Sequence, residues 1–142
     1  MLYLAADHAG FELKEKICHR LAARGVAFED FGTFSTKPVD YPDLTKQVVK
    51  EVLKHNGRGI LFCASGEGVA IAANRFKGIR AALVWKESVA VETREDNDAN
   101  VLALPAKYLS EEEAWQIVSA FLSTTFSHAE RHLRRIKQLD NL

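Results

Sequence analysis

Five short apolar runs alternate with longer segments that carry apolar residues at helical spacing, and this alternation constrains the fold more than any other feature. Each helix must cross back over the sheet before the next strand begins, so successive strands run parallel. We therefore predict a three-layer α/β/α, Rossmann-like fold with a five-stranded parallel sheet and an extra C-terminal helix. The expected strands are residues 2–6, 26–31, 60–62, 79–85 and 101–104, and the expected helices are residues 11–24, 40–54, 69–75, 86–95, 110–125 and 128–140.

Residue types at the expected helix ends support these boundaries. Gly25 follows the first helix and is a common helix stop. Ser110 and Glu113 have the spacing of a capping box, in which each side chain accepts a hydrogen bond from the other residue's backbone N–H. Cys18 lies on the apolar stripe of the first helix. We therefore expect Cys18 to be a core residue with no part in chemistry.

Length, charge and cysteine content limit the function classes. The chain has 142 residues, so we expect one domain over residues 1–142. Its net charge is zero, which argues against general binding to nucleic acid or to membrane surfaces. The two cysteines have neither the spacing of a metal site nor that of a disulfide framework. The chain begins with a strand-like run and contains no run of transmembrane length, so we expect a soluble, cytoplasmic protein.

Chemically useful residues follow four of the five predicted strands. Ligands of parallel α/β folds bind outside the carboxyl ends of the strands, so these residues should converge at one edge of the sheet. They are Asp7 and His8, Gly32 and Thr33, residues 63–65 (Cys-Ala-Ser), and residues 105–107 (Pro-Ala-Lys).

The segment 59–74 is the strongest candidate for a binding loop. A strand-like run ends at Cys63, residues 64–68 are mostly small, and a helix is expected from residue 69. Backbone N–H groups at a helix start have no intrahelical partner and attract anions, and the same field should lower the pKa of the Cys63 thiol. Two plainer interpretations remain open. Many strand–glycine–helix turns bind nothing, and a cysteine that ends a strand is commonly a core residue.

Nucleotide-binding patterns fit this loop poorly. It lacks the Gly-Lys-Ser/Thr ending of a P-loop. Ile71 occupies the third position of the dinucleotide-binding pattern, where glycine or alanine is expected, and the loop follows the third strand instead of the first. We therefore do not expect a nucleotide site.

Several motifs along nearly the whole chain occur in one characteristic order. They are residues 7–10 (Asp-His-Ala-Gly), 32–33 (Gly-Thr), 40–42 (Asp-Tyr-Pro), 63–68 (Cys-x-Ser-Gly-x-Gly), 71–74 (Ile-Ala-Ala-Asn), 78–81 (Gly-Ile-Arg-Ala), 97–102 (Asn-Asp-x-Asn-Val-Leu) and 131–135 (Arg-His-x-x-Arg). No single motif is specific, but their joint order is. In that order the chain resembles the ribose-5-phosphate isomerase B and galactose-6-phosphate isomerase family of sugar-phosphate isomerases.

The resemblance implies aldose–ketose isomerisation of a phosphorylated sugar through an enediolate, without a metal or another cofactor. Cys63 matches the base of the family, and Val69 stands where some relatives carry a Glu base. Ser65 matches a residue that relays a proton to or from the sugar oxygens. The oxyanion site implied by the resemblance consists of backbone N–H groups of Ala64, Ser65, Gly66, Glu67 and Gly68.

The resemblance also implies which residues bind the substrate. Asp7 and Tyr41 are expected to contact the sugar, whereas the phosphate clamp is formed by His8, Lys107, Arg131 and Arg135. Arg131 and Arg135 are four residues apart and share a helix face, and two guanidinium groups suit a phosphate. Spacing alone, however, favours a solvated basic helix for this pair.

Four positions depart from the pattern of the family. Asp96-Asn97, which we assign to the catalytic site, replaces a His-Asn pair whose histidine assists opening of the sugar ring. Lys107 replaces an arginine and loses its two-pronged geometry. Ala64 replaces a glycine. Glu67 introduces a carboxylate that we expect to point outward, to pair with an arginine or to contact hydroxyl groups of a different sugar. Another pentose phosphate or a hexose phosphate is therefore a candidate for the preferred substrate.

Two other functions and one assembly question remain open at this stage. The same residues would serve a non-catalytic sugar-phosphate-binding protein, and a plain α/β interaction domain would bind no sugar phosphate. Relatives are dimers or tetramers with sites shared between subunits. The resemblance therefore implies a homodimer or homotetramer, and the sequence leaves open which subunit supplies Asn97, Lys107 and the two arginines.

Overall fold

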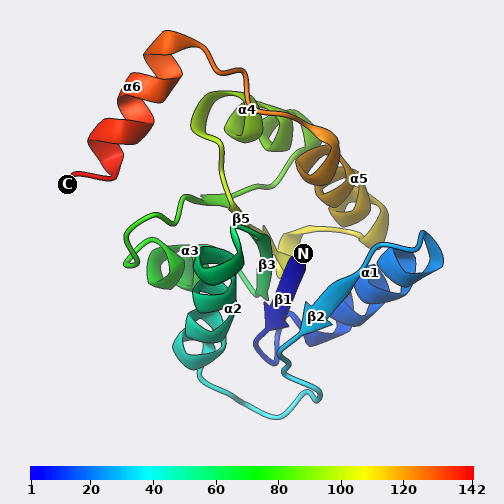
Figure 1. The fold of residues 1–142 in the computed structure, drawn as a ribbon. Coiled ribbons are helices and arrows are strands. Elements are labelled where there is room, and N and C mark those ends of the chain that lie inside the picture. The colour runs from blue at the N-terminus through cyan, green and yellow to red at the C-terminus, as the bar shows by residue number, and fades with distance from the viewer.

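The computed structural model describes all 142 residues, and a parallel sheet of five strands lies at its centre (Figure 1). The strand order is β2-β1-β3-β5-β4, and every neighbouring pair is parallel. The strands are β1 (Leu2–Ala6), β2 (Phe28–Asp30), β3 (Arg58–Cys63), β4 (Ala81–Leu83) and β5 (Val101–Pro105). The predicted three-layer α/β/α architecture is confirmed.

Six α-helices and one short 3-10 turn connect and cover the strands. They are α1 (Phe11–Ala23), α2 (Tyr41–His55), α3 (Glu67–Ala73), α4 (Glu87–Asn97), the 3-10 turn η1 (Ala106–Tyr108), α5 (Glu111–Ser123) and α6 (Glu130–Leu139). The predicted capping box is present at the start of α5, where Ser110 and Glu113 each accept the other's backbone N–H.

Two hydrophobic cores lie on opposite faces of the sheet. Side chains of α1, α4 and α5 pack on one face, and side chains of α2 and α3 pack on the other. Strand β1 shows the alternation that feeds both cores, because Leu2, Leu4 and Ala6 enter the first and Tyr3 and Ala5 enter the second. Burial of both faces is typical of a parallel sheet and explains why its strands read as continuous apolar runs.

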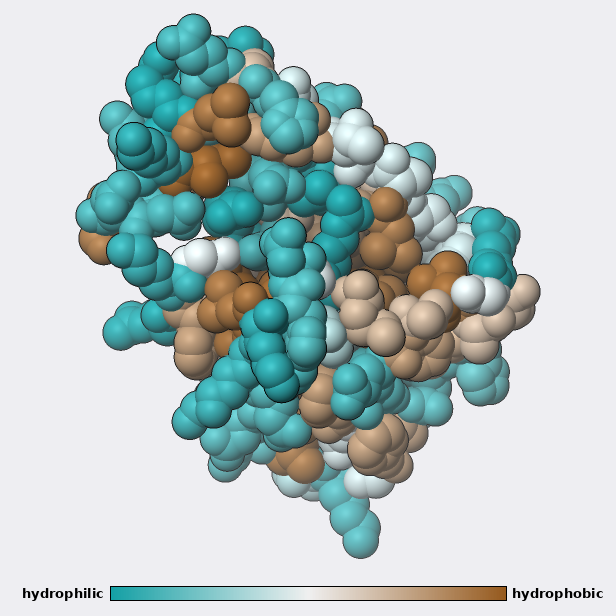
Figure 2. Space-filling view, in the orientation of Figure 1, coloured by the Kyte–Doolittle hydropathy of each residue, from teal (hydrophilic) through white to brown (hydrophobic).

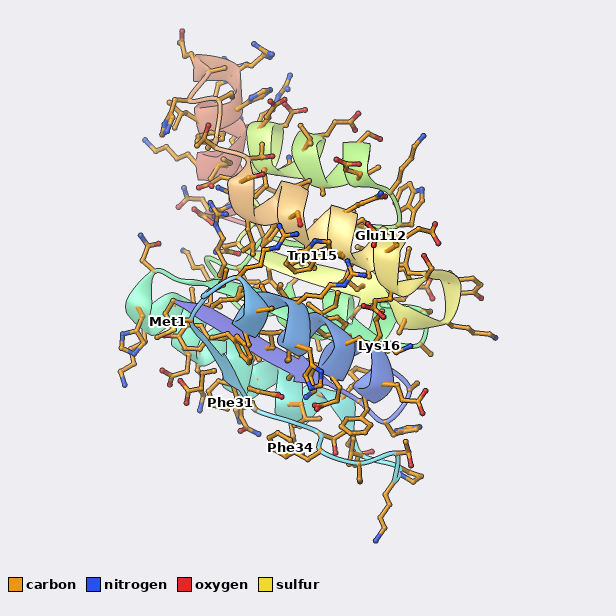
Figure 3. The ribbon with its side chains drawn as sticks, turned by 90° about the vertical axis from the view of Figure 1, so that its right-hand side faces the viewer. Met1, Lys16, Phe31, Phe34, Glu112 and Trp115 are labelled. Carbon is orange, nitrogen blue, oxygen red and sulfur yellow. The ribbon has the colours of Figure 1, made fainter.

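Helices α1 and α5 lie side by side over the first core (Figure 3). Trp115 projects from α5 toward α1, where the guanidinium groups of Arg20 and Arg24 lie over its ring. Arg20 also donates hydrogen bonds to Glu111 at 2.7 Å and Glu112 at 3.0 Å. Cys18 is buried in the same core, which confirms the structural role predicted for it.

Four elements have boundaries that differ from the prediction for physical reasons. The strands predicted at 26–31 and 79–85 are shorter, because β2 and β4 are the edge strands and pair on one side only. The central strand β3 is longer than predicted, since it pairs with β1 and β5 on both sides. Helix α3 begins at Glu67, two residues before the predicted start, because Gly66 turns the chain with a φ of 76°.

The last helix is set apart from the rest of the molecule. In Figure 1, α6 lies beside the end of α4 and away from the sheet. His132 is its only buried residue, whereas Leu133 and Leu139 are half-exposed and Leu142 is fully exposed. The predicted apolar side of this helix is therefore not covered within one chain.

Candidate functional site

Cys63 and Asp7 lie next to each other at the carboxyl edge of the sheet. Cys63 is the last residue of β3, and Asp7 follows the last residue of the neighbouring strand β1. The backbone N–H of Asp7 donates to the carbonyl of Phe62 at 3.1 Å, which extends the ladder past the end of β1. The Asp7 carboxylate accepts hydrogen bonds from the N–H groups of Ala9 and Gly10, at 3.0 and 2.9 Å. Its orientation is therefore fixed beside the thiol.

Close packing holds the loop between β3 and α3 in one conformation. A Cβ atom on Gly66 would lie 2.5 Å from Cδ1 of Leu83, and one on Gly68 would lie 2.7 Å from the ring of Tyr41. The hydroxyl of Ser65 accepts the backbone N–H of Glu67 at 3.3 Å. The tight packing around both glycines explains why this loop needs residues without side chains.

The electrostatic balance at Cys63 differs from the prediction. Burial and then the hydrogen bond with Asp7 and the charge of its carboxylate raise the pKa of the Cys63 thiol, and the hydrogen bonds from the backbone N–H groups of Gly66 and Ser65 only partly oppose them. The expectation of a lowered pKa was wrong, because it considered the loop N–H groups without the burial of the thiol and the Asp7 carboxylate beside it. The thiol is protonated in the free protein at neutral pH.

His8 and Lys107 lie at the same edge of the sheet. His8 follows Asp7 in sequence, and its Nδ1 accepts the backbone N–H of Val39 at 3.3 Å. In the neutral imidazole, the proton is therefore on Nε2. Lys107 belongs to η1, and its backbone N–H donates to the carbonyl of Ala64 at 3.0 Å. Both side chains thus extend from segments that are fixed against the Cys63 loop.

The Glu67 side chain is exposed on the first turn of α3 and makes no ion pair within the chain. The expected outward orientation is confirmed, whereas the expected pairing with an arginine does not occur inside one chain. The carboxylate therefore remains available to a ligand or to a second copy.

Four further predicted site residues lie elsewhere. Asp96 and Asn97 are the last residues of α4, which ends just before β5 begins, so they lie at the amino edge of the sheet. Arg131 and Arg135 are exposed on α6 and form no ion pair. Helix α6 joins this edge, because the N–H of Ser127 donates to the carbonyl of Glu95 at 3.2 Å. The predicted site residues of one chain therefore fall into two groups at opposite edges of its sheet, which we call the first half-site (at Cys63) and the second half-site (on α4 and α6).

The largest hollow of the molecule adjoins the second half-site and not Cys63. It has a volume of about 590 Å³ and lies between the segment from α3 to β4, the end of α4 and the C-terminal residues. Its lining includes Asn97, Arg80 and the apolar side chains of Leu139 and Leu142. Figure 2 shows this hollow below α6, with hydrophobic surface on both sides of it. An open hollow of this kind is suited to receive part of another molecule.

Sequence reasoning did not single out His132, which the structure places against the predicted site residue Asp96. Its ring is buried under α6, and its Nε2 atom lies 3.4 Å from a carboxylate oxygen of Asp96. The contact depends on how α6 packs against α4, which no local pattern in the sequence reveals. The only available signal was its position beside Arg131 in the motif at 131–135.

No group of three or more His, Cys, Asp or Glu side chains is arranged to hold a metal ion. None of the helices combines the length and hydrophobicity needed to cross a membrane.

Comparisons with known proteins agree on one family. The model of the family described as Ribose/Galactose Isomerase matches residues 2–139. A putative sugar phosphate isomerase of Rickettsia bellii is 39% identical, over 96% of this chain and 95% of that protein. The structure of a ribose 5-phosphate isomerase from Thermotoga maritima is 46% identical, has a TM-score of 0.97 and covers 99% of this chain and 97% of its own. The structure of ribose-5-phosphate isomerase B from Mycoplasma genitalium, which holds ribulose-5-phosphate, is 36% identical, has a TM-score of 0.94 and covers 99% of this chain and 93% of its own.

Proposed function

Because the chain belongs to the ribose/galactose isomerase family, we propose that it interconverts an aldose phosphate and the corresponding ketose phosphate, of the ribose 5-phosphate and ribulose 5-phosphate type. The observation that carries this proposal is the arrangement at the carboxyl edge of the sheet. There the thiol of Cys63 lies beside the fixed carboxylate of Asp7 and the N-terminus of α3. The ribulose-5-phosphate bound to the Mycoplasma relative supports the substrate class.

In the proposed reaction, Cys63 is the base. Its thiolate removes the proton from C2 of the open-chain aldose, the C2 electron pair forms a double bond to C1, and the carbonyl oxygen takes the negative charge. The backbone N–H groups of residues 64–68 stabilise that charge. Ser65 relays a proton from the oxygen on C2 to the oxygen on C1. Cys63 then returns its proton to C1, so the ketose forms with no net gain or loss of protons.

The raised pKa of Cys63 gives Asp7 a second task in this mechanism. The negative charge of Asp7 disfavours the thiolate in the free protein. A sugar hydroxyl that donates to this carboxylate would disperse part of its charge, because a hydrogen bond stabilises the ionised form. Substrate binding would then favour thiolate formation. In this way the base becomes active only when a sugar is bound.

The separation of the two half-sites supports a site shared between two copies of the chain. His8 and Lys107 lie at the Cys63 edge, whereas Arg131, Arg135 and the Asp96-Asn97 pair lie at the other. A two-fold axis would bring the first half-site of each subunit against the second half-site of its partner. The half-exposed leucines of α6 and the hollow below it offer apolar surface for this contact. We infer a homodimer, or a homotetramer built from such dimers.

Three residues support a substrate preference that differs from the preference of the family's ribose-5-phosphate isomerases for ribose 5-phosphate. Asp96 provides a carboxylate in place of an imidazole, Lys107 provides a point charge in place of a guanidinium, and exposed Glu67 adds an acceptor near the loop. These changes affect the groups expected to contact the sugar hydroxyls and the phosphate, and they leave Cys63 and its loop in place. A related pentose or hexose phosphate is therefore a candidate for the preferred substrate.

The test is proton exchange at C2 of a panel of aldose phosphates in deuterated water, followed by NMR. We expect deuterium at C2 and formation of the ketose with at least one member of the panel. The proposed chemistry uses only protein groups, so dialysis against a chelator should leave the rate unchanged. Thermal stabilisation by a sugar phosphate without exchange would instead identify a non-catalytic binding protein. A monomer at micromolar concentration in light scattering would contradict the shared site.

A further inference from the structure

His132 is an unusual histidine, because it is buried in a helix that is otherwise exposed. Its exposed fraction is 5%, and it lies in the first turn of α6 against the end of α4. Both ring nitrogens have a partner. Nδ1 lies 2.8 Å from the hydroxyl of Ser127, and Nε2 lies 3.4 Å from Oδ1 of Asp96.

The surrounding hydrogen bonds are compatible with one direction for this chain of contacts. The hydroxyl oxygen of Ser127 accepts the backbone N–H of Ala129 at 3.3 Å, so its own proton is free to be donated to Nδ1 of His132. In that direction the proton of the neutral ring is on Nε2, which lies 3.4 Å from Oδ1 of Asp96. The contacts therefore run from Ala129 through Ser127 and His132 to one oxygen of Asp96.

Asp96 presents its other carboxylate oxygen to the surface. Its side chain is 54% exposed, and Oδ1 is the only atom of the carboxylate that contacts a partner. Its neighbour Asn97 lines the hollow below α6. The contact with His132 thus involves one oxygen of this carboxylate and leaves the second without a partner in the chain.

We propose that His132 is a positioning residue for ring opening, which holds Asp96 so that the free oxygen of its carboxylate can move a proton on the cyclic sugar. This inference rests on the proposed function and adds to it. Asp96 stands where the family pattern has a histidine that assists ring opening. In this chain the imidazole of His132 lies 3.4 Å from the Asp96 carboxylate. A mobile carboxylate at an exposed helix end would otherwise have to be ordered by the substrate.

The proposed step is balanced without another reactant. Asp96 takes the proton of the anomeric hydroxyl on its free oxygen. The bond between C1 and the ring oxygen breaks, its electron pair stays on the ring oxygen, and a double bond forms between C1 and the anomeric oxygen. Asp96 then gives the same proton to the ring oxygen, which regenerates the carboxylate. The open-chain aldose that results is the substrate for Cys63.

Two assays separate ring opening from isomerisation. Net conversion of ribose 5-phosphate, which is mostly cyclic, requires the ring to open. Exchange of the C1 proton of ribulose 5-phosphate with deuterated water requires only the enediolate step, because the phosphate on its O5 prevents furanose closure. A residue that acts only in ring opening should therefore affect the first assay and not the second.

Two replacements of His132 form a matched pair. His132→Gln keeps an N–H donor at about the position of Nε2, whereas His132→Asn has an amide too short to reach Asp96. We expect His132→Asn to slow net conversion about tenfold or more while exchange changes less than about twofold. His132→Gln should recover most of the conversion. His19→Asn, a change of an exposed histidine on α1, should alter neither assay.

Each further result supports or overturns the inference. In an Asp96→Asn background, His132→Asn should have no additional effect, because the two residues act through one carboxylate. If His132→Asn unfolds the protein, Asp96→Asn alone must still slow conversion and spare exchange. Equal losses in both assays, equal losses from the Gln and Asn variants, or full activity of His132→Asn would overturn it. Wild-type protein without any exchange would refute the proposed function itself, and the inference with it.

Discussion

The two half-sites of this chain are built in different ways. The loop after β3 is part of the folded core, because Cys63 is buried, Gly66 has no room for a side chain, and Asp7 is fixed by two backbone N–H groups. The half-site on α4 and α6 lies at the surface. Its two arginines are free, and α6 is joined to the body mainly through His132, Ser127 and the contact of Asp140 with Arg80 at 3.8 Å.

This difference suggests a division of labour. A reaction that moves protons between carbon atoms needs donors and acceptors fixed to within fractions of an ångström, and a packed loop provides that precision. A phosphate carries a concentrated charge that the two exposed arginines, Arg131 and Arg135, can bind. We expect substitution of Cys63 in the first half-site to abolish isomerisation, and substitution of Arg131 and Arg135 in the second to weaken binding of the phosphate.

The largest effect is expected at Cys63. Cys63→Ala should lower isomerisation and C2 exchange by about 10²- to 10⁴-fold, because it removes the base while the small side chain preserves the fold. Steady-state kinetics and circular dichroism provide the check. Cys18→Ala is the matched control, since Cys18 is also buried but lies in the core under α1. It should reduce thermal stability and leave turnover intact. Wild-type turnover in Cys63→Ala would show that Cys63 is not the base.

An intermediate effect is expected from the arginines of α6. The double variant Arg131→Ala/Arg135→Ala should raise KM about 10- to 100-fold, because each exposed contact with the phosphate, partly replaced by water in the variant, contributes about 0.7–1.4 kcal/mol of net binding free energy. Its melting temperature should stay the same, since both side chains are exposed and unpaired. Arg134→Ala removes one charge from the same helix and should change KM little. If Arg134→Ala raised KM as much as the double variant does, the arginines would act through the general positive charge of α6 and not by direct contact with the phosphate.

The smallest effect concerns the pH at which Cys63 ionises. The pKa of Cys63 in the free protein is raised above its ordinary value of 9.0, by burial first and by Asp7 next. The rate of alkylation by iodoacetamide should therefore rise with pH through a midpoint above that value, and Asp7→Asn should shift the midpoint downward. Burial raises the pKa of Cys18 to about 12, so alkylation of Cys18 should begin at a higher pH than alkylation of Cys63. Peptide mapping by mass spectrometry distinguishes the two thiols.

The same shift has a consequence for stability, with a defined sign. A raised pKa in the folded state means that folding favours the protonated thiol. This contribution to stability is fully present below the ordinary thiol pKa and is lost as the pH rises through the folded pKa. Wild-type protein should therefore lose stability relative to Cys63→Ala only at alkaline pH. A relative gain in stability with rising pH would mean that the pKa of Cys63 is lowered.

The architecture of the sheet and the first half-site could be predicted from the sequence. Continuous apolar runs, Gly25 and the capping box at Ser110 are local signals that tertiary structure did not override. The rule that carboxyl ends of parallel strands meet correctly placed Asp7 near Cys63. The edge strands β2 and β4 were predicted too long, since strand length at an edge depends on pairing and not on hydrophobicity alone.

The features that were missed depend on contacts between distant segments. The raised pKa of Cys63 follows first from burial of the thiol and then from the Asp7 carboxylate, which follows the neighbouring strand, and together they outweigh the loop N–H groups that local reasoning considered. The contact of His132 with Asp96 follows from the way α6 packs on α4. The position of Arg131 and Arg135 at the far edge likewise becomes apparent only when the path of α4 and α6 is known.

The shared site is tested most directly with purified hetero-oligomers of two differently tagged chains, assayed below KM. If one chain carries Cys63→Ala and the other carries Arg131→Ala/Arg135→Ala, one site of each dimer is intact, and we predict about half of the wild-type activity. If one chain carries all three substitutions and the other is wild type, every site has lost one half, and we predict almost no activity. The reverse result, with the first pair inactive and the second at about half of wild type, would contradict a site assembled from two subunits.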